Sequence, residues 1–216
     1  VIDPALKPTA IPVTAEKMPD EIMYKGTSLP FNEFLKQTDT NAFIVLRNGV
    51  MTFEWYKDGV SQQTQLPSYS VAKTMTSIMI GQLVSQGKIK ESDKFVDYFP
   101  ELKNGSSFDL VTIKQLLDMQ AGVGVSDNYP SGPSGWGVAI AQMYATTDLN
   151  WFLGNNRKMA FAPGTSAEYR SVDTQMLGMI IKKVTGMRIT DYFSENVWQK
   201  VGAEFPATWP AGRPPA

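Results

Sequence analysis

The feature that most constrains this chain is a long apolar segment that begins at a serine. A proline-containing loop leads into an S-x-x-K pattern at Ser70 and Lys73, and apolar residues then recur as far as Val84. This pattern predicts a helix that is buried on nearly all sides. Residues three apart share a helix face, with Cβ atoms about 5–6 Å apart. We therefore expect the side chains of Ser70 and Lys73 to lie side by side in the first turn, where unpaired backbone N–H groups and the helix dipole favour an anion.

This serine–lysine pair could support nucleophilic chemistry. Serine is a weak nucleophile and needs a base to activate it. The chain contains no His and no Cys, so a thiol nucleophile is excluded and the base would be a Lys, a Tyr or a carboxylate. A lysine can act as a base when burial lowers its pKa toward neutrality, and the apolar helix would provide such surroundings. The pattern fixes only two positions, so the alternative is an N-cap serine followed by a solvated lysine.

Size and charge narrow the class of protein further. The 216 residues fit one domain, and 43% hydrophobic with 19% charged residues is enough for a sizeable core. The net charge of −1 argues against nucleic acid or an anionic membrane as the main partner. No run approaches the ~18 apolar residues of a membrane span. A chain without Cys fits the cytoplasm or the periplasm, of which we favour the periplasm, and without Cys or His we expect no zinc and no other cofactor.

The clearest strand signal is a hairpin. Residues 42–47 and 50–56 are rich in β-forming types and flank Asn48-Gly49, which favours a type I′ turn because both central residues need positive φ. The second strand alternates, with Met51, Phe53 and Trp55 on one face. Elsewhere we expect helices at 31–37, 112–119, 138–152, 176–184 and 189–201, a turn-rich connector at 95–102, a surface arm at 1–20 and an unpatterned tail at 205–216.

A glycine-rich stretch separates two of these helices. Residues 122–137 contain five Gly and two Pro, a composition that predicts a loop. Tyr129 and Trp136 lie in it. These aromatic residues either line a substrate-binding cleft or pack into the core, and the sequence does not choose between the two.

Several blocks in a fixed order resemble one known superfamily. They are the hairpin segment 43–49 and the segments 67–73, 112–119, 161–164, 169–171 and 177–186. Together they resemble the serine β-lactamase and penicillin-recognising superfamily, in its class C-like branch with esterase and 6-aminohexanoate-dimer hydrolase relatives. The resemblance runs from about Phe31 to Gly202. It implies an α+β or α/β, β-lactamase-like fold, with a helical lobe packed on an antiparallel sheet.

The resemblance also implies roles for individual residues. It suggests a serine hydrolase that cleaves small amide or ester substrates through an acyl-enzyme on Ser70, with Lys73 as base. Tyr169-Arg170-Ser171 stands where the superfamily has Tyr-x-Asn. Tyr169 would then carry the proton between Ser70 and the leaving group, and Ser171 would contact Lys73 or substrate. The alternative for Tyr169 is a core aromatic residue at a helix start.

A second triplet points to another branch. Ser126-Asp127-Asn128 spells the S-D-N that accompanies S-x-x-K in class A β-lactamases. In that class the triplet lies between helices, whereas here a segment with two prolines follows at once. An Asp-Asn pair is also common in turns. We therefore expect the triplet to be a turn rather than a class A motif.

The chain departs from the superfamily at its C-terminal side. The strands that complete the sheet and the oxyanion hole, and the third motif on one of them, would follow the last expected helix, but only a proline-rich tail follows Gly202. We therefore interpret residues 1–216 as a single β-lactamase-like domain that is an N-terminal fragment, with a hairpin region at 30–60 and a mainly helical lobe at 68–202. A second, complementary C-terminal chain, or a rebuilt fold, would be the alternatives.

The alternative function is a non-catalytic one. A penicillin-recognising binding or sensor module, or an inactive fragment, would keep the same motifs without turnover. A helical scaffold with no site is a third possibility, in which Ser70 and Lys73 would matter only for stability.

Overall fold

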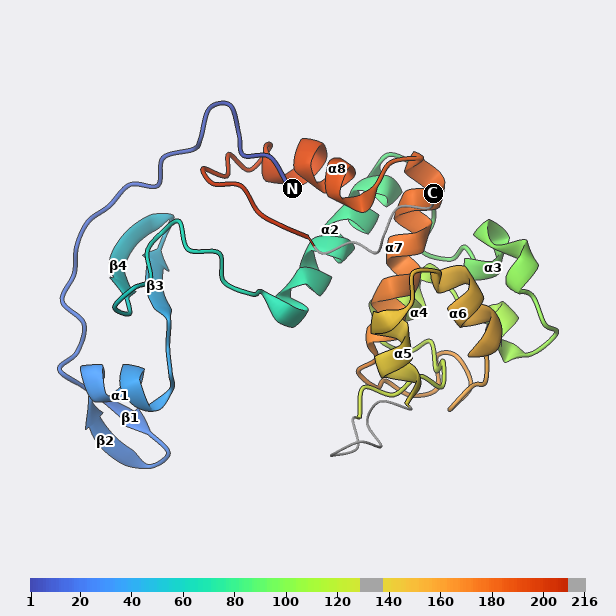
Figure 1. Ribbon diagram of the computed structural model, residues 1–216, viewed down its shortest axis with the longest axis horizontal. Helices are drawn as coiled ribbons and strands as arrows, with labels where there is room; N and C mark the ends of the chain where they lie inside the picture. Colours follow the sequence, from blue (N-terminus) through green and yellow to red (C-terminus); the bar gives the residue numbers. More distant parts are fainter. Residues whose placement is uncertain (129–137, 210–216) are drawn as a thin grey trace.

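The computed structural model describes residues 1–128 and 138–209. They form an N-terminal part, with two small antiparallel hairpins and one helix, and a larger helical lobe (Figure 1). The two parts lie side by side along the longest axis of the molecule (Figure 1). Among the described residues no helix is both long and apolar enough to cross a lipid bilayer.

The predicted hairpin is confirmed, with the bounds expected from the sequence. Strand β3 (Ala42–Arg47) pairs antiparallel with β4 (Val50–Tyr56). The turn residues Asn48 and Gly49 have φ of 51° and 79°, as a type I′ turn requires.

A second hairpin, β1 (Glu21–Tyr24) with β2 (Thr27–Pro30), was not predicted. Its two strands have only four residues each, which leaves little alternation to detect in the sequence.

Helix α1 (Phe31–Gln37) packs on the β1–β2 hairpin and contacts the β3–β4 sheet through its first residue. The ring of Phe31 contacts those of Phe43 and Phe53 edge to face, with centroids 5.4 and 5.6 Å apart. Residues 12–16 border the other edge, where Met51 donates its backbone N–H to Pro12 at 2.8 Å. The helical lobe lies to one side of this hairpin in Figure 1.

Helix α2 (Ala72–Ser85) follows a 3₁₀ turn at Tyr69–Val71. Its buried side chains are Thr76, Met79, Ile80 and Leu83. The expectation that this helix is buried on nearly all sides is wrong, because Val71 and Ile78 are 61% and 42% exposed. In the described residues α2 packs on α7 (Figure 1).

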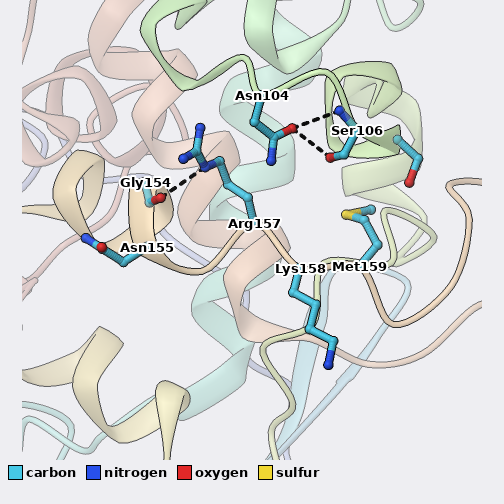
Figure 2. A pocket seen from close by; sticks show the side chains of 8 residues that line it. Asn104, Ser106, Gly154, Asn155, Arg157, Lys158 and Met159 are labelled. Carbon is cyan, nitrogen blue, oxygen red and sulfur yellow. Dashed lines mark hydrogen bonds between the residues drawn. The ribbon is translucent and has the colours of Figure 1, made fainter.

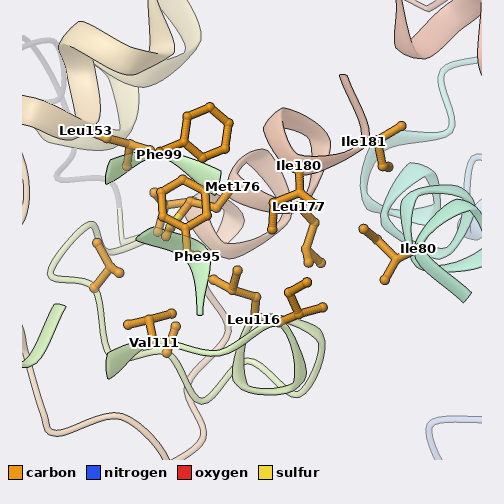
Figure 3. Close-up of a cluster of buried hydrophobic side chains, with 14 of the residues drawn as sticks. Ile80, Phe95, Phe99, Val111, Leu116, Leu153, Met176, Leu177, Ile180 and Ile181 are labelled. Atoms are coloured by element: carbon orange, nitrogen blue, oxygen red, sulfur yellow. The ribbon is translucent and has the colours of Figure 1, made fainter. Parts of the chain in front are cut away.

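Helix α7 (Ser171–Thr185) runs through the centre of the lobe. It contacts α2, α3 (Phe95–Tyr98), α4 (Ile113–Leu117) and α5 (Ala139–Ala145). Figure 3 shows the side chains that meet there, among them Ile80, Phe95, Leu116, Met176 and Ile180. Burial of each such side chain stabilises the fold by about 1.5–3 kcal/mol.

The remaining helices are close to their predicted positions. The predicted helix 138–152 is two helices, α5 and α6 (Leu149–Asn155), because Asp148 accepts a hydrogen bond from the Trp151 N–H at 2.9 Å and so starts a new helix. Helix α8 (Ile189–Phe193) continues into a π-helical turn, Ser194–Trp198. Short 3₁₀ turns occur at Pro100–Leu102 and Ser107–Leu110.

The N-terminal arm is not only a surface segment, as we expected it to be. Ile2 and Ala5 are buried, and Ile2 exchanges two backbone hydrogen bonds with Ala207, at 2.8 and 3.0 Å. The arm then runs on to β4 (Figure 1). Residues 1–16 therefore connect the C-terminal segment of the helical lobe with the β3–β4 hairpin.

Candidate active site

Ser70 lies in the 3₁₀ turn directly before α2. The preceding residue, Tyr69, has a φ of 44°, in the left-handed region that non-glycine residues seldom adopt. Such a backbone costs about 1–3 kcal/mol and concentrates at functional sites. In the part of the chain that the structure describes, the Ser70 backbone N–H donates to no protein acceptor. The turn thus presents both the hydroxyl and a free N–H at the start of a helix.

Three predicted site residues meet around the hydroxyl of Ser70. The Nζ of Lys73 lies 3.2 Å from Ser70 Oγ, and the phenol oxygen of Tyr169 lies 2.6 Å from the same atom. The Lys73 Nζ also lies 5.0 Å from the centroid of the Tyr169 ring. Residues 70 and 169 are 99 positions apart in the sequence, so this contact depends on the packing of α2 against the segment that precedes α7.

The surroundings of Tyr169 favour loss of its phenol proton. Partial burial raises the pKa of this phenol, but the hydrogen bonds with Lys73 and Ser70 and the positive charge of Lys73 outweigh it. The carboxylate of Asp127 acts in the opposite direction, because a nearby negative charge raises the pKa. The net result is a pKa below the ordinary value of 10.0.

The cluster is open rather than dry. Ser70 is exposed, Lys73 is half-buried and Tyr169 is 50% exposed. The dry pocket that we expected around Lys73 is therefore not present in the described residues. Lys73 lies two turns before Ile80 and so at the border of the buried face of α2, which explains its partial burial.

Ser171 is buried and has a different neighbour from the one we expected. It is the first residue of α7, and Asp127 accepts both its backbone N–H, at 2.6 Å, and its hydroxyl, at 2.5 Å. No hydrogen bond joins Ser171 to Lys73 among the described residues. Its role in substrate binding stays a prediction.

The other two predicted binding residues, Tyr129 and Trp136, lie outside the described residues. The triplet before them forms the expected turn, because the Asn128 N–H donates to Ser126 Oγ at 3.1 Å. Asp127 points away from this turn to Ser171 and is the site residue that the sequence interpretation passed over. The Ser126-Asp127-Asn128 triplet was the available signal.

A second acidic residue, Asp173, is fully buried in the first turn of α7. Burial raises the pKa of its carboxyl to about 7, although the positive charge of the nearby Arg170 guanidinium lowers it. The side chain of Arg170 is itself buried, where it donates to Glu168 at 2.8 Å and lies 5.7 Å from the centroid of the Phe161 ring. Two of these side chains, Glu168 and Arg170, flank Tyr169 in the sequence.

A surface hollow of about 450 Å³ lies elsewhere, beside α6 (Figure 2). Arg157 donates there to the carbonyl oxygens of Gly154 and Leu102, each at 3.0 Å. The guanidinium thus joins the end of α6 to the 3₁₀ turn that precedes the loop at Asn104. No lining residue belongs to the Ser70 cluster. Among the described residues no three acidic side chains are grouped to hold a metal ion.

A helical lobe centred on α2 and α7, with a serine, a lysine and a tyrosine meeting where α2 begins, is the arrangement that the resemblance to the serine β-lactamase and penicillin-recognising superfamily implied. The chain belongs to the β-lactamase family, whose family model matches residues 31–215. Its combination of helices and small antiparallel sheets is the β-lactamase-like fold that the motifs predicted.

Several known relatives carry the names of hydrolases. The chain is 29% identical over 195 residues to a 6-aminohexanoate-dimer hydrolase of Paenarthrobacter ureafaciens, covering 85% of this chain and 48% of that one. It is 29% identical over 143 residues to a β-lactamase of Escherichia coli, covering 66% and 34%. A solved Bacillus anthracis structure named after 6-aminohexanoate-dimer hydrolase superposes with a TM-score of 0.76 at 26% identity, over 91% and 54%. The chain thus spans about half the length of these relatives or less.

Proposed function

We propose that this protein is a serine hydrolase that cleaves amide or ester bonds of small molecules through an acyl-enzyme. The observation that carries this proposal is the position of Ser70 Oγ within hydrogen-bonding distance of both Lys73 Nζ and the Tyr169 phenol. A nucleophile needs a base at this distance. The chain has no His to supply one.

The proposed reaction begins with transfer of the Ser70 hydroxyl proton to the Lys73–Tyr169 pair, in which one of the two groups, amine or phenol, has given up its proton. Ser70 Oγ then attacks the carbonyl carbon, and the resulting oxyanion accepts a hydrogen bond from the Ser70 N–H. The Tyr169 phenol donates a proton to the leaving nitrogen or oxygen as its bond to carbon breaks. Water finally attacks the acyl-enzyme with the same groups as base and acid, which releases the acid and restores Ser70. No step needs a metal or a cofactor.

We further propose a complementary polypeptide as the partner for full turnover. Ser70 and Tyr169 are exposed in the described chain, and the named relatives are about twice as long. An oxyanion hole works best with two donors in a site that excludes water, and Ser70 itself provides one. A complementary chain of the same family would add the second donor and cover the substrate.

The second candidate is a penicillin-recognising sensor or binding module. The exposure of the Ser70 cluster favours it, because an open site stabilises the transition state for deacylation poorly. In this case Ser70 would be acylated and the acyl group would stay in place.

The test is covalent labelling of the full chain. We expect a fluorophosphonate and a penicillin to modify Ser70, with the adduct located by peptide mass spectrometry. Ser70→Ala should abolish labelling, whereas the matched control Ser68→Ala, in the same exposed turn, should retain it. Labelling at another residue, or none even with the complementary half of a relative added, would overturn the proposal. Release of the acyl group over time separates the hydrolase from the sensor, and a linear amide offered beside the penicillin tests the substrate class.

A further inference from the structure

We propose that Asp127 is a positioning residue that, by binding the first residue of α7, holds the Tyr169 phenol against Ser70. This inference rests on the proposed function and adds a residue to its machinery. Asp127 touches neither Ser70 nor Lys73 in the described hydrogen bonds, so its action passes through the backbone that carries Tyr169.

The segment that carries Tyr169 is fixed at two points. On one side the Glu168 N–H donates to the Met119 carbonyl oxygen at 3.0 Å. On the other side Asp127 accepts two hydrogen bonds from Ser171, one from the backbone and one from the side chain. Tyr169 lies between these two points and reaches Ser70 with its hydroxyl. If the hydrogen bonds to Asp127 are lost, the segment is held only by the Glu168–Met119 bond, and the Tyr169 phenol can move away from Ser70 Oγ.

The contact has the features of a strong one. A carboxylate that accepts two hydrogen bonds at 2.5–2.6 Å is charge-assisted. It also faces the positive end of a 15-residue helix. Ser171 is buried, so little water competes for these bonds.

Charge provides a second line of argument. The groups that act on Tyr169 come from two elements: Lys73 of α2 with its positive charge, and Asp127 with its negative charge. The negative charge of Asp127 also raises the pKa of the buried Asp173 carboxyl, which the Arg170 guanidinium lowers. Besides binding Ser171, the Asp127 carboxylate therefore acts on the Tyr169 phenol itself, where it opposes the effect of Lys73 on the pKa.

Three variants separate positioning from simple helix capping. Asp127→Ala removes both hydrogen bonds and the charge. Asp127→Asn keeps an acceptor for the Ser171 N–H but removes the charge. Asp148→Ala is the matched control, because Asp148 accepts the Trp151 N–H at the start of α6 in the same way, away from the Ser70 cluster.

Two measurements are made on the full chain of each variant. The first is the rate of Ser70 acylation by a p-nitrophenyl ester, as a function of pH. The second is the titration of the Tyr169 phenol by the NMR signal of ¹³Cζ-labelled tyrosine, assigned with Tyr169→Phe. Circular dichroism confirms that each variant is folded.

We expect Asp127→Ala to slow acylation by up to about 10²-fold, because a 1 Å misplacement of a reacting group can cost that much. Asp127→Asn should recover most of the lost rate, and its Tyr169 titration should move to lower pH by roughly half a unit, because a negative charge has gone. The pH dependence of acylation should move with it. Asp148→Ala should change neither measurement.

Equal losses in Asp127→Ala and Asp148→Ala, or an unshifted Tyr169 titration in Asp127→Asn, would overturn the positioning role. If the unmodified protein is not acylated at Ser70, the proposed function fails. The Tyr169 titration still decides the inference in that case, because it needs no turnover.

Discussion

The two faces of helix α2 differ in what covers them. On one face Ile80 is fully buried against α7, together with Met79 and Leu83. On the other face Ile78, only two residues away, is 42% exposed. Ser70 and Lys73 begin the helix at the border between these faces, and Tyr169 reaches them from the segment before α7.

This difference separates stability from chemistry. The buried face holds α2 on α7 through apolar contacts, which dominate the free energy of folding. The exposed Ser70 cluster contributes little to it, because hydrogen bonds that can be replaced by water are worth about 0.5–1.5 kcal/mol each. A substitution in the exposed Ser70 cluster should therefore lower the activity and change the stability little. A substitution on the buried face should lower the stability and change the activity of the folded protein little.

The largest expected effect is on acylation, at Ser70. Ser70→Ala removes the nucleophile, so covalent labelling by a penicillin or a p-nitrophenyl ester should fall below detection. Because Ser70 is exposed, the free energy of unfolding should change by less than about 0.5 kcal/mol in urea titrations. A large loss of stability in this variant would contradict the separation between the two faces.

The next effect is the loss of the phenol. Tyr169→Phe keeps the ring beside Lys73 but removes the hydroxyl that contacts Ser70. We expect acylation to slow about 10²–10⁴-fold, the usual contribution of a positioned acid–base group. Tyr144→Phe is a suitable control, since Tyr144 is a similarly exposed tyrosine on α5. An unchanged acylation rate in Tyr169→Phe would leave Lys73 as the sole base.

On the buried face of α2 we expect a substitution to lower the stability rather than the activity. Ile80→Ala removes a fully buried side chain and should lower the free energy of unfolding by about 2–5 kcal/mol, because it leaves a cavity against α7. The folded fraction should still be labelled at Ser70. A urea titration followed by circular dichroism gives the stability, and labelling at low temperature gives the activity. Retained stability in this variant would mean that α2 is held in place by other contacts.

Asp173 adds a dependence on pH beneath the site. Burial raises the pKa of its carboxyl to about 7 in the folded chain, against an ordinary value of 3.8 for an exposed one. The folded state therefore holds this proton more tightly, so stability is complete below about pH 4 and falls as the pH rises through 7. We expect a loss of about 2–4 kcal/mol between pH 4 and pH 8 from this group.

Asp173→Asn tests this dependence, because the amide is neutral at every pH. Its free energy of unfolding should vary less between pH 4 and pH 8 than that of the unmodified chain, and should exceed it at pH 8. Urea titrations at both pH values give the comparison. Equal pH dependence in the two proteins would place the titrating group elsewhere.

The sequence predicted the local features of this molecule well. The bounds of β3 and β4 were predicted correctly, because Asn-Gly between two alternating segments is a strong signal for a two-residue hairpin turn. The proximity of Ser70 and Lys73 was predicted from their spacing of three residues, and that of Tyr169 from the resemblance to the superfamily.

What the sequence did not show depends on tertiary packing. Helix α2 is apolar nearly all round, so its pattern cannot tell which face a neighbour covers, and the exposure of Val71 and Ile78 was missed. The contact of Asp127 with Ser171 joins residues 44 positions apart, and a polar turn residue gives no sign of its distant partner. The burial of Ile2 against the C-terminal segment was missed for the same reason.

The smallest effect is expected at Ile78. Ile78→Gln replaces a partly exposed side chain and should change the free energy of unfolding of the isolated chain by less than about 0.5 kcal/mol. If a complementary chain covers this face of α2, the same substitution should weaken its binding, because an apolar contact is then replaced by a polar group without a partner. Titration of a labelled C-terminal half of a relative, with Ile78→Gln compared against the unmodified chain, measures this difference. Equal binding by both would mean that the exposed face of α2 is not the surface at which the site is completed.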